Sequence, residues 1–138
     1  MLKKLNQLLF APPKWEHRPW GRYRVIWSDR GYLVKVLEIN PGQAISLQKH
    51  AHRHEYWTVV SGEGIVTDDP QLWHVDDRSP KRQFSIPKGR IHQVENTGKT
   101  TLTIIEVQFG ATLDENDIER LADRYGRATT AQKKPTSV

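Results

Sequence analysis

Polar side chains at fixed spacings across two expected β-hairpins constrain this chain more than any other feature of its sequence. The spacings are G-x5-Q-x-H-x4-E-x6-G and P-x-G-x2-H-x3-N, and the residues are Gly42, Gln48, His50, Glu55, Gly62, Pro87, Gly89, His92 and Asn96. Residues two apart on a strand share a face, so Gln48 and His50 point the same way. Glu55 opens the next apolar run, and His92 follows a turn. We therefore expect these polar side chains to lie on the facing walls of one small barrel.

Two imidazoles, one carboxylate and one amide form a ligand set for a divalent metal with an open coordination position. The residues that we predict to hold this metal are Gln48, His50, Glu55 and His92. Zn²⁺ suits these nitrogen and oxygen donors, and Mn²⁺, Fe²⁺, Co²⁺ and Ni²⁺ are alternatives.

Short apolar runs separated by turn residues fill the middle of the chain. We expect strands over residues 21–27, 32–39, 45–50, 56–60, 65–67, 72–75, 84–86, 91–95 and 101–109. Such short strands and turns are typical of an all-β sandwich or barrel. Asp114 is a good N-cap and Gly126 a C-cap, which predicts one short C-terminal helix. We expect an N-terminal arm over 1–17, one domain over 18–127 and a mobile tail over 128–138.

Composition narrows the possible partners of this chain. It contains no cysteine, which excludes a disulfide framework and is compatible with a cytoplasmic location. The net charge of +5 is spread along the sequence without a basic stripe, so we expect no nucleic-acid partner. No apolar segment reaches membrane-spanning length, so we expect no membrane association. A barrel with exposed sheet edges needs cover, which favours a homodimer.

The two spacings resemble the two-part signature of the cupin superfamily, G-x5-H-x-H-x3,4-E-x6-G followed by P-x-G-x2-H-x3-N. Gln48 stands where the first histidine normally lies. A competing register makes His50 and His52 the histidine pair and leaves Gln48 as a strand residue, but its spacings to Gly42 and Glu55 do not fit the pattern. The resemblance implies a cupin double-stranded β-helix, or jelly-roll barrel.

A closer resemblance is to the isomerase domain of type II phosphomannose isomerases, often fused behind a mannose-1-phosphate guanylyltransferase. The matching segments are residues 18–21, 46–62, 86–92, 105–110 and 117–127. This resemblance implies a metal-dependent isomerase that interconverts mannose 6-phosphate and fructose 6-phosphate, with a hexose phosphate as substrate. Phosphomannose isomerases of the other class hold zinc with a glutamine, two histidines and a glutamate, the same set as predicted here. Nucleotide transfer is not expected.

The implied reaction needs cations for the phosphate and a group that moves a proton. For the phosphate and the anionic intermediate we propose Arg18, Arg53 and Arg127, followed by Lys35 and Lys88, because guanidinium groups bind phosphate bidentately. The proton-transfer candidates are His52, His54 and Glu106. Glu106 shares a strand face with Leu102 and Ile104, and burial there should raise its pKa.

Two positions depart from the pattern of the family. Tyr56 replaces a histidine after the motif glutamate, and Thr112 replaces a tyrosine. These departures favour an alternative function, a non-catalytic cupin that binds a sugar phosphate or a sugar nucleotide. A third interpretation is a small Fe²⁺-dependent cupin dioxygenase, against which Gln48 in place of a histidine argues.

Overall fold

A computed structural model describes residues 14–129, and this part of the chain contains eleven strands and no helix. The strands are β1 (Glu16–Arg18), β2 (Gly21–Asp29), β3 (Tyr32–Ile39), β4 (Leu47–Lys49), β5 (His54–Ser61), β6 (Gly64–Asp68), β7 (Gln71–Val75), β8 (Gln83–Ile86), β9 (His92–Asn96), β10 (Leu102–Phe109) and β11 (Glu119–Ala122). Each of the nine expected strands is present, with ends shifted by a few residues.

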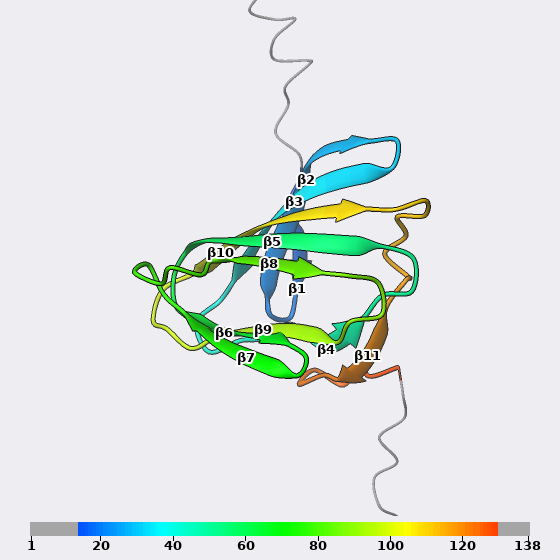
Figure 1. The fold of residues 1–138 in the computed structure, drawn as a ribbon. Helices are drawn as coiled ribbons and strands as arrows, with labels where there is room; N and C mark the ends of the chain where they lie inside the picture. Colours follow the sequence, from blue (N-terminus) through cyan, green and yellow to red (C-terminus); the bar gives the residue numbers. More distant parts are fainter. Residues whose placement is uncertain (1–13, 130–138) are drawn as a thin grey trace, which may run out of the picture.

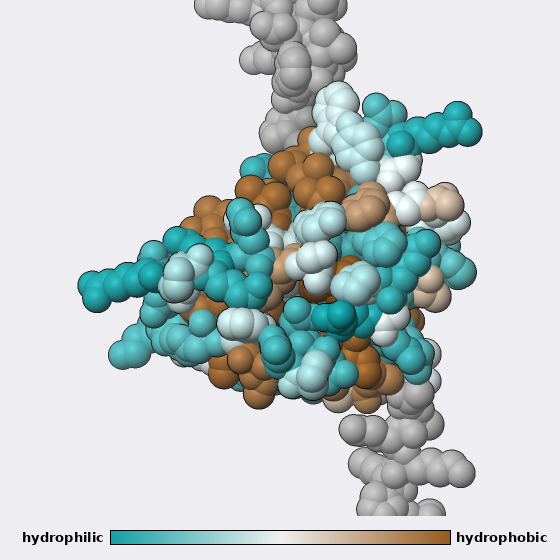
Figure 2. Space-filling model, in the orientation of Figure 1, coloured by the Kyte–Doolittle hydropathy of each residue, from teal (hydrophilic) through white to brown (hydrophobic). Residues whose placement is uncertain are grey.

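The strands form two antiparallel sheets that face each other (Figure 1). The larger sheet has the order β1-β2-β3-β10-β5-β8, and the smaller has the order β11-β4-β9-β6-β7. This is the double-stranded β-helix expected from the sequence. In the same view most surface residues are hydrophilic, and hydrophobic residues are exposed in a few places (Figure 2).

Every second side chain along the strands points inward, and these side chains fill the space between the sheets. On β10, Leu102 and Ile104 are buried at one end of the inward face, and Glu106 and Gln108 are buried at the other. On β3, Lys35 shares the inward face with Leu37 and Ile39. The barrel therefore has a hydrocarbon core at one end and a polar interior at the other. The polar end contains the candidate site.

The short C-terminal helix is contradicted by the structure. Asp114 accepts a hydrogen bond from the backbone N–H of Asn116, so it caps a turn instead of a helix. Glu119–Ala122 then forms β11, which pairs with β4 and places Arg120 opposite Gln48. A helix of this length is marginal by itself, so pairing with a sheet edge outweighs the local capping signals.

The start of the domain also differs from the expected division. Glu16 and His17, expected in the arm, belong to β1 and pair with Tyr23 and Arg22 of β2. The rest of the arm and most of the expected tail, residues 1–13 and 130–138, lie outside the described residues. Within residues 14–129 no helix is long and apolar enough to cross a membrane.

Candidate active site

Three buried side chains from two strands and a loop converge at the polar end of the barrel. His50 follows β4, Glu55 lies on β5, and His92 begins β9. The Nε2 atoms of His50 and His92 are 3.2 Å apart. Oε1 of Glu55 lies 3.0 Å from Nε2 of His50, and Oε2 lies 3.4 Å from Nε2 of His92. One small volume is thus surrounded by potential donor atoms of all three side chains.

Backbone carbonyls fix the orientation of both imidazole rings. Nδ1 of His50 donates to the carbonyl oxygen of Asp117 at 2.7 Å, and Nδ1 of His92 donates to that of Arg90 at 2.8 Å. A carbonyl oxygen only accepts, so Nδ1 of each ring carries a proton, and Nε2 of each ring is directed toward Glu55 and the other ring. Histidine ligands of metals are commonly held in this way.

A turn in the second motif joins the two halves of the site. Gly89 has φ +77°, a conformation that side chains with a Cβ rarely adopt, and its N–H donates to the carbonyl oxygen of His50 at 2.8 Å. Asn96, the last residue of that motif, is buried at the other end of β9. Its amide donates to the carbonyl oxygens of Ile39 and Thr100, so its position is that of a structural residue.

Neighbouring N–H groups and the two imidazoles stabilise the carboxylate of Glu55. Arg53 donates to Oε1 through Nε at 2.9 Å, and Trp57 donates to Oε2 through Nε1 at 3.1 Å. Burial opposes the charge, but the contacts with His50 and His92 outweigh it and hold the pKa of this carboxyl well below its usual range. Glu55 is therefore a carboxylate at neutral pH.

These three residues fit a divalent metal ion. Metal–ligand bonds of about 2.1 Å with angles between octahedral and tetrahedral separate adjacent donor atoms by about 3.0–3.4 Å, which is the spread seen here. The Nε2 atoms of both rings and the carboxylate of Glu55 also converge on one buried position, which suits a cation. His50, Glu55 and His92 can hold the ion.

Gln48 shares the face of this site. It is the cross-strand partner of His92, and its side chain lines a pocket that Glu55 also lines. Its Oε1 accepts a hydrogen bond from the Ser46 hydroxyl at 3.1 Å. Metal ligation by Gln48 stays a prediction.

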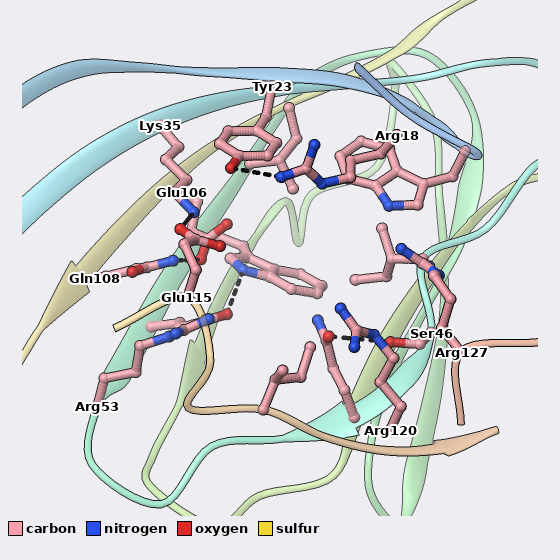
Figure 3. A pocket seen from close by; sticks show the side chains of 17 residues that line it. Arg18, Tyr23, Lys35, Ser46, Arg53, Glu106, Gln108, Glu115, Arg120 and Arg127 are labelled. Atoms are coloured by element: carbon pink, nitrogen blue, oxygen red, sulfur yellow. Dashed lines mark hydrogen bonds and ion pairs between the residues drawn. The ribbon is translucent and has the colours of Figure 1, made fainter. Parts of the chain in front are cut away.

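A pocket of about 80 Å³ opens beside these residues (Figure 3). Its apolar walls include Trp20, Leu37, Ile45 and Trp57. Glu106, Lys35, Gln108 and Arg53 line one end, near Glu55, whereas Arg18, Arg120 and Arg127 line the other. The two ends are called the carboxylate end and the arginine end below.

Glu106 at the carboxylate end has the strongly raised pKa of a buried acid. Burial, together with the negative charge of Glu55, raises the pKa of Glu106 to about 8, although Lys35 and Gln108 act in the opposite direction. Gln108 donates to its Oε1 at 2.7 Å. Lys35, itself buried, forms an ion pair with Glu115 from the loop that follows β10, and its Nζ lies 4.4 Å from the centre of the Tyr23 ring.

The arginine end gathers three guanidinium groups from both ends of the described chain. Arg18 ends β1 and donates to the Tyr23 hydroxyl at 3.2 Å. Arg127 is held by two side-chain hydrogen bonds to Asp123, each 2.9 Å long. Burial and the nearby charge of Arg127 lower the pKa of Arg120. Mutual repulsion of this kind is relieved when an anion binds among the cations.

Most of the residues predicted for catalysis and substrate binding line the pocket. Those that do are Arg18, Lys35, Arg53, Glu106 and Arg127, and their roles stay predictions. His52 and Lys88 do not: both are exposed residues outside the pocket lining. His54 lies on the opposite face of β5 from Glu55, where its ring stacks on Phe109 at 5.0 Å.

The exposed position of His52 also bears on the competing register. His50 and not His52 joins Glu55 and His92, so the structure favours the Gln48/His50 register. The two departures from the family pattern lie away from the pocket. Tyr56 points outward from β5, and Thr112 is an exposed loop residue.

Sequence reasoning missed Tyr23, Glu115 and Arg120 as pocket residues. Arg120 was not predicted as a pocket residue, because a helix over this segment gave no reason to place the Arg120 side chain next to Gln48. The alternation in β2 could have identified Tyr23, which shares an inward face with Gly21. Glu115 carries no signal of its own, since an acidic residue in a polar loop is ordinary.

Comparisons with known proteins agree with this geometry. Residues 11–123 match the family described as "Mannose-6-phosphate isomerase C-terminal". The chain is 39% identical over 133 residues to the mannose-1-phosphate guanylyltransferase of Escherichia coli (strain K12), a match that covers 91% of this chain and 27% of that protein. The chain thus spans about a quarter of the length of this relative.

Two solved structures share the fold. The capsular polysaccharide assembling protein CapF from Staphylococcus aureus superposes with a TM-score of 0.67 at 25% identity, over 81% of this chain and 35% of that chain. A protein with a double-stranded β-helix domain from Klebsiella pneumoniae superposes with a TM-score of 0.60 at 21% identity, over 72% of this chain and 83% of that chain. The second likeness supports the fold alone.

Proposed function

The chain belongs to the family of mannose-6-phosphate isomerase C-terminal domains, and from that premise we propose that it is a metal-dependent isomerase that interconverts mannose 6-phosphate and fructose 6-phosphate. The observation that carries the proposal is the convergence of His50, Glu55 and His92 beside a pocket that also holds Glu106 and a cluster of arginines. Aldose–ketose isomerisation needs these three parts together: an electrophile, a base and an anion site.

His50, Glu55 and His92 would hold the metal, with Gln48 as the fourth ligand that the sequence proposes. Zn²⁺ suits this donor set best. When bound, the metal would polarise the sugar carbonyl and stabilise negative charge on its oxygen. Arg53, which donates to Glu55 and lies 3.3 Å from Nε2 of His50, would keep that carboxylate oriented and add positive charge beside the substrate oxygens.

We assign proton transfer to Glu106, since of the three sequence candidates it alone lines the pocket. Its carboxylate would take the proton from C2 of the open-chain sugar and return it to C1, while the C2 hydroxyl proton passes to the C1 oxygen. This sequence of steps turns the aldose into the ketose without loss of atoms. A pKa of about 8 means that the ionised form of Glu106 binds a proton strongly, which makes it an effective base.

Arg18, Arg120 and Arg127 would bind the phosphate at the opposite end of the pocket from Glu106. Guanidinium groups form paired, charge-assisted hydrogen bonds with phosphate oxygens. Anchoring the phosphate there would hold the C1–C2 end of the open-chain sugar against Glu106 and the metal ligands.

The test is isomerisation by the purified protein after it has been loaded with Zn²⁺, Mn²⁺, Fe²⁺, Co²⁺ or Ni²⁺ in separate samples. Mannose 6-phosphate incubated in D₂O should give fructose 6-phosphate, and proton NMR should detect solvent deuterium at the carbon that receives the proton. Absence of turnover in every metal-replete sample would reject the isomerase proposal.

A second candidate is a sugar-phosphate-binding protein without catalytic activity. One contact favours it: the guanidinium of Arg53 already approaches both Glu55 and His50, so a cation of the chain itself partly satisfies the metal-binding groups. This candidate predicts that mannose 6-phosphate raises the Tm in the presence of EDTA, with no isomerisation in any metal.

A further inference from the structure

The outer face of the larger sheet, turned away from the pocket, is unusually apolar. Among the described residues seven large hydrophobic side chains are exposed, and five of them lie on this face: Trp27, Tyr32, Tyr56, Val60 and Ile105. A sixth, Ile26, is next to Trp27 at the bulge of β2. The seventh, Leu72, is on β7 of the smaller sheet. Hydrophobic atoms reach the surface near the region of β2 and β3 in Figure 2.

Strand register makes these side chains contiguous. The central row runs across four strands, with each residue opposite the next, in the order Trp27, Val34, Val107 and Tyr56. Val36 and Ile105 pair in the row on one side, and Tyr32 and Phe109 pair in the row on the other. The outward positions of β10, from Thr103 to Phe109, include no charged residue.

The aromatic side chains of the outer face are ordered against one another. The rings of Tyr56 and Phe109 stack with centroids 5.3 Å apart and an interplanar angle of 11°. The indole N–H of Trp27 donates to the Tyr32 hydroxyl at 2.9 Å. These contacts limit the side-chain entropy that an association would have to overcome.

An antiparallel sheet with a solvated face normally alternates between apolar inward and polar outward residues. This face breaks that alternation over four strands in its central row and over β3 and β10 in the two flanking rows. With its rim it measures roughly 19 Å across the strands and about 20 Å along them. Contiguous apolar patches of several hundred Å² mark interaction sites. Two such faces with their rims would bury on the order of 1,000 Å², the lower range for a specific interface.

We propose that the outer face packs against the same face of a second copy of this chain, with the two-fold axis parallel to the strands between β3 and β10. Val34 then lies over the partner's Val107, and Trp27 lies against the partner's Tyr56. The valines therefore meet next to the two-fold axis, and the larger aromatic side chains meet farther from it. Two antiparallel sheets stack in this manner in β-sandwiches, and a two-fold interface uses the same patch twice.

Side-chain size favours this axis over the perpendicular one. An axis across the strands through the central row would place Trp27 on the partner's Trp27 and Tyr56 on the partner's Tyr56. The axis along the strands separates these like pairs. It also places Arg24, which flanks the face on β2, over the partner's Thr58, an uncharged outward residue of β5.

Sedimentation velocity of the full chain tests the interface. We expect a dimer at about 100 µM, and we expect Tyr56→Glu and Ile105→Glu each to weaken its association by about 100-fold, because a charge would be buried at the interface. Leu72→Glu, an equally drastic change at a side chain that is 70% exposed on the other sheet, should leave the dimer intact. Circular dichroism checks that all three variants fold.

A wild-type protein that remains monomeric at this concentration would overturn the proposal, as would a dimer that Tyr56→Glu and Ile105→Glu leave unchanged. The absence of natural cysteines allows a second measurement of the axis. Arg24→Cys and Thr58→Cys proteins, mixed and treated with a short bismaleimide, should cross-link more than either variant alone, because these residues are three strands apart within one copy. Equal cross-linking in the single-variant samples would contradict the proposed axis. Neither measurement depends on enzymatic activity.

Discussion

The two ends of the pocket are built in different ways. The carboxylate end takes its side chains mostly from the central strands β3, β5 and β10, and the neighbouring His92 and Glu55 side chains are 0% and 2% exposed. The arginine end takes its side chains from β1, β11 and the segment after β11, where Arg18 is 39% exposed. The groups to which we assign metal binding and proton transfer thus lie mostly on rigid inner strands, and the groups to which we assign phosphate binding lie at the periphery.

This difference implies that changes at the two ends should affect different measured quantities. Substitutions at the carboxylate end should alter metal content or kcat, because the groups there act on the reacting atoms. Substitutions at the arginine end should alter KM, because their contacts with the phosphate are made in both the ground state and the transition state.

The largest effect is expected from His92→Ala. Loss of one buried imidazole removes a metal ligand, so we expect metal content to fall to background and activity to fall by about 10³-fold or more. Elemental analysis of the purified protein measures the first, and the isomerase assay measures the second. His52→Ala is the matched control, since His52 is exposed outside the pocket. Full metal content in His92→Ala would show that the site is assigned wrongly.

The second-largest effect on activity is expected from Glu106→Gln. The amide keeps the shape and can still contact Gln108, but it cannot accept a proton from carbon, so kcat should fall by about 10²- to 10⁴-fold. Metal content should be unchanged, which separates this variant from His92→Ala. Glu95→Gln, at a residue that forms an ion pair with Arg124 away from the pocket, is the control. Retained kcat in Glu106→Gln would exclude it as the base.

A smaller change is expected from Arg18→Met and Arg120→Met. Each removes one charged contact with the phosphate, so KM for mannose 6-phosphate should rise by about tenfold while kcat changes little. Arg30→Met, in the turn between β2 and β3, should behave like the wild type because it lies outside the pocket. If kcat falls with KM unchanged, these arginines would not be simple phosphate ligands.

The smallest effect concerns Asp123, which holds Arg127 in place. Burial opposes its charge, but hydrogen bonds from Arg127 lower the pKa of this carboxyl. A lowered pKa adds stability above the ordinary aspartate pKa of about 3.9, and this stability is lost as the pH falls through the folded-state value. Asp123→Asn should therefore reduce the free energy of unfolding by about 1–2 kcal/mol at pH 7.

Urea unfolding of Asp123→Asn and the wild type at a series of pH values measures this difference. The gap between the two proteins should narrow as the pH is lowered below about 4. A gap that stays constant down to pH 2.5 would mean that the Asp123 carboxylate does not provide the stabilisation. KM should rise as well, since Arg127 would lose its anchor.

The elements that the sequence predicted well are those that carry a local signal. Alternating burial and Pro–Gly or Gly-containing turns located nine strands, and the motif spacing located His50, Glu55 and His92. The inward face of Glu106 and its raised pKa followed from alternation along β10 and from burial. In each case one strand and its neighbours in sequence were enough.

The segment after residue 113 could not be predicted in this way. Asp114 and Gly126 are good helix caps, and the sequence between them offers no clear alternation, so local rules favoured a helix. The pairing of β11 with β4 depends on a partner about 70 residues earlier in the chain. Arg120 and Glu115 reach the pocket only because of that pairing and the loop before it.

The sequence by itself therefore determined the barrel, the buried triad of His50, Glu55 and His92, and the family, because periodicity and spacing along a strand decide which side chains share a face. The tertiary structure alone decided which cations and acids line the pocket, and it placed His52 and Lys88 outside that lining. Those positions depend on contacts between distant segments, whose free energy exceeds that of the local preferences that a sequence pattern records.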